Sequence, residues 1–187
     1  MSLRKRKRGL LSIREIVIFA MLGAMMTAAD LVMNLIPNVH IGVMLIVVFT
    51  LVYRWKALFP IYVFVLLIGI VEGFGTWWFA YLYIWAILWL AVMLLPRKMP
   101  HWLAPIVYSA VCAAHGFAFG LLWAPSDMLF HHFTWEQIVV WWKWGFITAD
   151  IPHGIGKLCA SVLILPLTAL LRKLNGSIGL HRYAQTP

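Results

Sequence analysis

The chain has 187 residues, of which 64% are hydrophobic and only 11% are charged, and its formal net charge is +9. These values lie far from those of soluble globular domains and indicate a polytopic membrane protein with little mass outside the bilayer. A chain of this length that crosses the bilayer six times has no room for a soluble catalytic or nucleotide-binding domain. We therefore expect one all-α domain of six transmembrane helices over residues 1–187.

Six apolar runs follow one another, and basic residues lie in alternate connections between them. Thirteen of the 15 Lys and Arg residues fall at the two chain ends and in the second and fourth connections; the exceptions are Lys143 and Lys157. Positive charge beside a span stays cytoplasmic, so we expect cytoplasmic termini: a basic segment at 1–12 and a tail at 172–187. Anionic lipid headgroups explain this charge better than nucleic acid does. The predicted spans are residues 13–36, 41–53, 57–71, 77–95, 102–123 and 147–171.

The longest stretch between predicted spans covers residues 125–146, and we expect it on the extracellular side. A connection of this length is often functional. Within it, Thr134 precedes a pattern typical of a short interfacial helix, with Thr134 as the N-cap. His131 and His132 are adjacent, but no third ligand follows at a useful spacing, so we expect no metal site.

Polar and aromatic side chains are concentrated at the ends of the predicted spans that we expect on the extracellular side. Asp30 and Asn34 are one helical turn apart, and Asp150, His153 and Lys157 recur at helical spacing in the last run. Seven of the eleven tryptophans also fall on this side, more than an aromatic belt requires, and aromatic walls with a few polar groups suit a ring-containing ligand. The substrate-binding residues that we expect are Asn34, Asn38, His40, Glu72, Trp77, Trp78, Tyr81, His131, Trp135, Trp142, Asp150 and His153.

Lys157 permits two interpretations. It lies about 10 Å deeper than Asp150 along a helix, and an ionisable residue at such a depth is a functional candidate that needs a partner. The alternative is a structural ion pair with Asp30 or Glu72.

The first run carries Ala20, Ala24 and Ala28 at a spacing of four residues. Small residues at this spacing form a shallow groove that another helix can approach closely. The spacing alone does not decide whether that helix belongs to this chain or to a partner.

Together, six short-looped helices with both ends inside, Ala20-x-x-x-Ala24 and polar-aromatic outer connections resemble an S-component, the substrate-binding membrane subunit of an energy-coupling factor (ECF) vitamin transporter. Residues 36–85 and 144–167 are similar to the cobalamin-specific group of S-components. The resemblance implies capture of cobalamin or a related corrinoid outside the cell, and docking of Ala20, Ala24 and Ala28 on a transmembrane coupling subunit. It also implies two cytoplasmic ATPase subunits that hydrolyse ATP, no cofactor in this chain, and a location in the cell membrane of a prokaryote.

Other functions stay open. The chain has no GxSxG, HExxH or P-loop motif, so we expect no catalytic residues; a membrane-embedded lipid enzyme would need a nucleophile or metal cluster that the inner connections do not offer. An S-component for a smaller compound, such as pantothenate, a thiamine precursor or a queuosine precursor, is one alternative. A self-sufficient small carrier is another, although the inverted repeats that would favour it are not evident.

Overall fold

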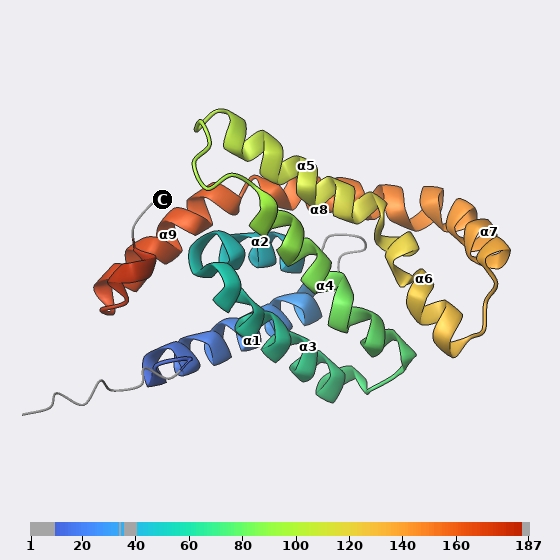
Figure 1. The fold of residues 1–187 in the computed structure, drawn as a ribbon, viewed down its shortest axis with the longest axis horizontal. Coiled ribbons are helices and arrows are strands. Elements are labelled where there is room, and N and C mark those ends of the chain that lie inside the picture. Colours follow the sequence, from blue (N-terminus) through green and yellow to red (C-terminus); the bar gives the residue numbers. More distant parts are fainter. Residues whose placement is uncertain (1–9, 34, 36–40, 185–187) are drawn as a thin grey trace, which may run out of the picture.

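The computed structural model describes residues 10–33, 35 and 41–184. Within these ranges the secondary structure is helical and no strand occurs, so the predicted all-α class is confirmed for this part of the chain (Figure 1). The elements are α1 (Ile13–Met33), α2 (Ile41–Tyr53), η1 (Arg54–Ala57), α3 (Leu58–Glu72), α4 (Thr76–Leu94), α5 (Leu103–Phe117), α6 (Phe119–Phe130), α7 (Trp135–Gly145), η2 (Phe146–Asp150), α8 (Ile151–Ser161), α9 (Ile164–Ser177) and η3 (His181–Tyr183).

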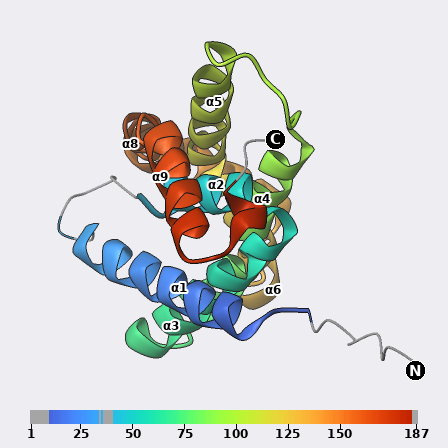
Figure 2. The same ribbon diagram turned by 90° about the vertical axis from the view of Figure 1, so that its left-hand side faces the viewer.

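Helix α2 is the centre of the bundle. Figure 2 shows it surrounded by α1, α4, α5, α8 and α9. Every residue of α2 except Ile41 and Leu51 is buried, as expected for a helix that is apolar all round. Its side chains form one core with Phe19 of α1, Ile61 of α3 and Ile84 of α4.

The number of membrane spans is only partly settled. Within the described residues, three helical segments are long and apolar enough to cross a membrane, and two helix pairs bent by 41° and 49° would bring the number to five if each pair is one span. These features are typical of a membrane protein, while six spans and their orientation stay predictions. The predicted six and the upper number of five differ in the segment Ile41–Glu72, where two spans were predicted. This segment is long and apolar enough to count as one span. However, η1 interrupts it, and Arg54 takes a left-handed φ of 56°.

The stretch 125–146 is helical over most of its length, because α6 continues to Phe130 and α7 begins at Trp135. The predicted N-cap is confirmed. Thr134 Oγ1 accepts a hydrogen bond from Gln137 N, and the Gln137 side chain accepts one from Thr134 N at 2.8 Å, which completes a capping box. Helix α7 then continues through the π-helical η2 into α8.

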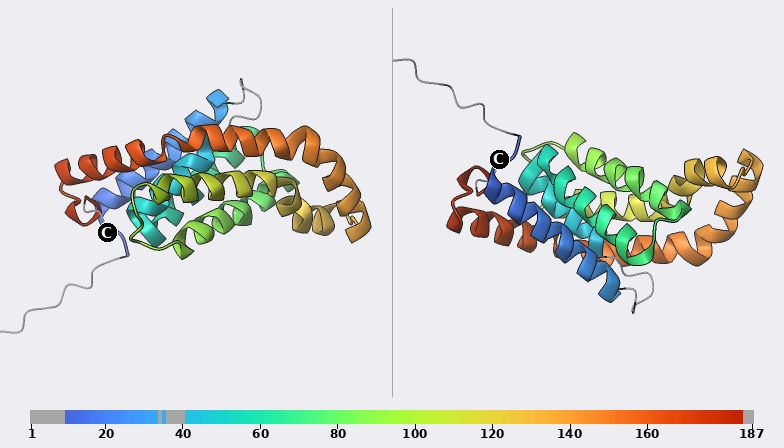
Figure 3. Two further views of the ribbon diagram at one scale, coloured as in Figure 1. Left: turned by 90° about the horizontal axis from the view of Figure 1, so that it is seen from above. Right: turned by 90° about the horizontal axis from the view of Figure 1, so that it is seen from below.

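Close helix contacts depend on glycines. Helices α5 and α8 run side by side (Figure 3), and a Cβ atom on Gly116 would lie 2.5 Å from Gly154 Cα. A Cβ on Gly23 of α1 would lie 2.5 Å from Val63 Cγ1 of α3. Because neither position has room for a side chain, glycine lets these backbones approach.

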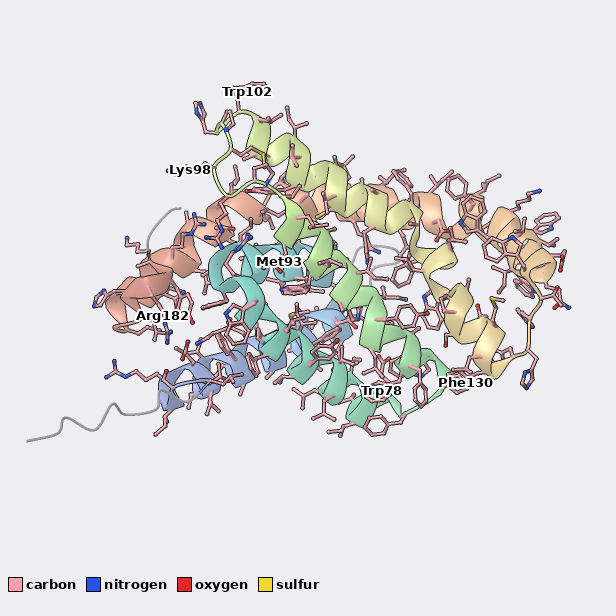
Figure 4. The ribbon with its side chains drawn as sticks, viewed as in Figure 1. Trp78, Met93, Lys98, Trp102, Phe130 and Arg182 are labelled. Carbon is pink, nitrogen blue, oxygen red and sulfur yellow. The ribbon has the colours of Figure 1, made fainter. Side chains whose placement is uncertain are left out.

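The two ends of the bundle differ in chemistry. In Figure 4, Lys98 and Arg182 lie towards one end, whereas Trp78 and Phe130 lie towards the other. Here we call the first the basic end and the second the aromatic end. The separation agrees with the alternation of charge along the sequence, and which end faces the cytoplasm stays a prediction.

At the basic end, the buried carboxylate of Glu15 bonds to residues of three separate parts of the chain. Glu15 of α1 is fully buried, and its Oε1 accepts from Lys56 Nζ and from Arg182 Nη2, each at 2.8 Å, and from the hydroxyl of Tyr183. Its Oε2 accepts from the backbone N and the hydroxyl of Ser12, each at 2.8 Å. This network joins α1, η1 and η3, which are far apart in sequence.

Candidate functional site

A cavity of about 190 Å³ lies among α1, α2, α3, α4, α6 and α8. Its polar wall contains Asp30, Tyr81, His153 and Lys157. Its aromatic wall contains Phe64, Trp85 and Phe119, and α2 supplies the aliphatic floor. We call this the Lys157 cavity.

Lys157 is the most unusual residue of this cavity. It is only 1% exposed, and its ammonium group has no hydrogen-bond partner among the described residues. The Nζ atom lies 4.1 Å from the centroid of the Phe119 ring, a cation–π contact that does not replace an acceptor. The ion pairs found in the described part of the chain join Glu15 to Lys56 and Arg182, so the structural-pair interpretation of Lys157 gains no support. A buried cation without an acceptor is suited to an anionic ligand group.

The histidine beside it is held in a defined orientation. His153 Nδ1 lies 2.8 Å from the carbonyl oxygen of Ala149, which can only accept, so Nδ1 carries the proton. The imidazole stacks on Phe119 with 5.4 Å between ring centroids. On the facing helix, Tyr81 packs edge-on against Trp85 at 5.2 Å. The site therefore combines a fixed imidazole, an ammonium group and the Asp30 carboxyl group with flat apolar walls.

Asp150 and Trp142 line a different cavity, of about 200 Å³, between α6 and α7. Asp150 is 2% exposed, and its Oδ1 accepts from Gly120 N at 2.8 Å. Within the described ranges, neither Asp150 Oδ2 nor the buried Trp142 Nε1 has a hydrogen-bond partner. Asp150 is positioned by η2, and π-helical turns of this kind often occur at functional sites.

Of the remaining predicted site residues, those that the structure describes line neither cavity. Trp78 Nε1 donates to Val65 O at 2.8 Å, and Trp77 packs on Tyr81, which itself lines the Lys157 cavity. Glu72, His131 and Trp135 are exposed. Asn34, Asn38 and His40 lie outside the described residues; Asp30 and Gly42, which precede and follow them, both line the Lys157 cavity.

Three cavity residues were absent from the sequence prediction: Phe64, Trp85 and Phe119. Trp85 follows Tyr81 by one helical turn, a signal that could have been used. Phe64 and Phe119 carry no such signal, since they resemble every other aromatic residue in an apolar run. No group of three or more His, Cys, Asp or Glu side chains that could hold a metal was found among the described residues.

The alanine stripe of α1 faces away from the bundle. Ala20, Ala24 and Ala28 are all exposed, whereas Phe19 and Gly23, each one position earlier on the helix, are buried. The close approach of α1 to α3 uses Gly23, not the alanines. The stripe is therefore accessible to lipid or to another protein.

No protein-family model matches the chain, and the searches of curated proteins and of solved structures gave no match either.

Proposed function

We propose that this chain is the substrate-binding membrane subunit of an ECF-type importer and that it holds a small anionic ligand with a flat group in the Lys157 cavity. The observation that carries this proposal is the buried ammonium group of Lys157, which has no acceptor and lines a cavity with aromatic walls. A ligand carboxylate or phosphate would supply that acceptor, and Trp85 and Phe119 would cover the flat part.

The size of the cavity favours the smaller of the ligands considered. At about 190 Å³ it is below the range of roughly 300–1,000 Å³ that is usual for drug-sized ligands. A corrinoid is several times larger than this cavity, and its binding would require the helices around the cavity to separate. A compound of the size of pantothenate, which bears a carboxylate and whose flat part is a planar amide group, agrees better with both the volume and the charge.

The partner part of the proposal rests on α1. The exposed alanines Ala20, Ala24 and Ala28 would let a helix of a transmembrane coupling subunit approach closely. Import against a gradient needs an energy source, which cytoplasmic ATPase subunits bound to that coupling subunit would provide.

The test is titration calorimetry of the purified chain with pantothenate, hydroxymethylpyrimidine, cobinamide and cobalamin, beside mass spectrometry of any small molecule that co-purifies. The variant is Lys157→Met, and the control is Lys143→Met, which removes the same charge from an exposed position of α7. Loss of a charge-assisted hydrogen bond should weaken binding of an anionic ligand by about 10- to 100-fold, and Lys143→Met should leave it unchanged.

The ligand-free protein adds a second readout. Because Lys157 is a buried charge without an acceptor, Lys157→Met should make the empty protein more heat-stable while it loses affinity. Tight corrinoid binding that Lys157→Met does not change would place the ligand elsewhere.

A further inference from the structure

A third cavity, of about 260 Å³, lies at the basic end of the bundle. Four arginines line it, each from a different part of the fold: Arg54 begins η1, Arg97 lies between α4 and α5, Arg172 is in α9 and Arg182 is in η3. The hydroxyl-bearing Tyr108 of α5 completes its wall. We call it the arginine cavity.

The described residues that line the arginine cavity include no acidic side chain. Arg182 is paired with Glu15 at 2.8 Å, while Arg54, Arg97 and Arg172 form no ion pair with any described carboxylate. Cations that converge on one cavity repel one another, so an anion bound among them would relieve that repulsion.

Two of the arginines are also held in fixed orientations. Basic residues that only set the orientation of a protein in the membrane do not need such contacts. Arg54 and Arg172 are half-buried, and each donates to a backbone carbonyl: Arg54 to Met93 O at 3.2 Å and Arg172 to Leu51 O at 3.4 Å. Arg54 Nε is buried and has no hydrogen-bond partner in the part of the chain that the structure describes. These contacts hold the two guanidinium groups at the cavity and leave at least one donor unused.

Arg54 occupies a backbone conformation that is unfavourable for it. Its φ of 56° lies in the left-handed region, which glycine and asparagine adopt more readily than a long side chain does. Unfavourable backbone geometry of this kind persists mainly at functional sites. Here it accompanies the reversal between α2 and α3 that brings the Arg54 side chain to the cavity.

We propose that the arginine cavity binds a phosphate group, carried either by the headgroup of an anionic lipid or by a soluble phosphate compound. Guanidinium groups bind phosphate oxygens through paired hydrogen bonds, and basic pockets between membrane helices are suited to anionic headgroups. The assignment does not depend on the proposed transport function, since it uses a separate cavity and separate residues.

The sequence offers a matched control, because two of the arginines are followed by a lysine that does not line the cavity. The variant Arg97→Gln/Arg172→Gln removes two charges from the cavity, and Lys98→Gln/Lys173→Gln removes two charges beside it, from exposed positions. A third double variant, Arg97→Lys/Arg172→Lys, keeps the positive charges but replaces the planar guanidinium groups with ammonium groups. It replaces the glutamine variant in the test if the glutamine variant does not fold. Elution profile and helicity of the full-length chain show which variants fold.

Two probes separate the two sources. In the first arm, native mass spectrometry measures retention of dioleoylphosphatidylglycerol against dioleoylphosphatidylcholine; in the second, calorimetry in lipid-free detergent measures binding of inorganic phosphate at constant ionic strength. For a lipid headgroup, the glutamine pair at the cavity should lower phosphatidylglycerol affinity about tenfold or more, with an intermediate loss for the lysine pair and none for the control pair. If the ligand is a soluble phosphate compound, the affinity for inorganic phosphate in the calorimetry arm should fall most in the glutamine pair, less in the lysine pair and not in the control pair. Equal losses in the cavity and control pairs, or no loss in either arm, would overturn the proposal and leave the cluster as a topology signal.

Discussion

The Glu15 network allows a stability prediction with a worked magnitude. The side chains of Glu15 and Lys56 are 1% and 9% exposed, whereas that of Arg182 is 56% exposed. Removing one partner of a buried pair leaves an uncompensated buried charge, which typically costs about 3–5 kcal/mol, whereas an exposed ion pair contributes about 0–1 kcal/mol. We therefore expect Glu15→Gln to lower the free energy of unfolding by about 3 kcal/mol and Arg182→Gln by less than about 1 kcal/mol.

A double variant separates this explanation from a general loss of packing. When both members of a buried pair become apolar, the charge cost disappears, so Glu15→Met/Lys56→Met should be less destabilised than Glu15→Gln alone. The assay is reversible unfolding in mixed micelles of a mild detergent and increasing dodecyl sulfate, followed by circular dichroism. If Glu15→Gln costs no more than Arg182→Gln, or if the double variant is the least stable of the set, then Glu15 does not neutralise a buried Lys56 and the reasoning is wrong.

Three further outcomes are expected. Ala24→Trp should leave ligand binding by the isolated chain intact but reduce complex formation with the coupling subunit and ATP-driven uptake, because a bulky side chain blocks close helix approach; intact uptake would mean that the stripe faces only lipid. In whole cells, an impermeant reagent should label a cysteine placed at Gln137 but not one placed at Lys98, and labelling at Lys98 alone would contradict the predicted orientation. Burial and its bond to Glu15 raise the pKa of Tyr183, so the stability that this phenol contributes is fully present below the unfolded pKa of about 10 and is lost as the pH rises towards the native value. The stability difference between the native protein and Tyr183→Phe, measured by thermal unfolding from pH 8 to 11, should therefore shrink at high pH; a difference that is constant over this range would contradict the assignment.

How far the sequence predicts this fold depends on the kind of information each feature needs. The apolar runs and the charge alternation are local patterns, and they predicted the helical class and the separation of basic and aromatic ends. The capping box at Thr134 is also local, because it needs only residues three positions apart. The bend between α5 and α6 and the π-helical turn before Asp150 are not local in this sense, since they depend on how α6 and α8 pack.

The candidate site shows the same limit more strongly. His153 and Lys157 were recognised because ionisable residues are rare in apolar helices, but their aromatic neighbour Phe119 was not, as nothing in an apolar run distinguishes one aromatic residue from another. Trp77 and Trp78 were predicted to bind substrate, yet in the structure they pack against Tyr81 and Val65. Composition predicts that an aromatic wall exists, and only the packing of α3, α4 and α6 decides which rings form it.

The Lys157 cavity and the arginine cavity lie at opposite ends of the central helix α2. This arrangement bears on how a ligand could cross the membrane. Ile46 of α2 lines the Lys157 cavity and Leu51 lines the arginine cavity, about 7.5 Å apart along the helix axis. The residues between them, from Val47 to Thr50, are all buried in the core. The core around these residues of α2 therefore separates the two cavities. If the chain acts as we propose, movement of the whole bundle by a partner docked on α1 would disturb less of this core than opening a path along α2.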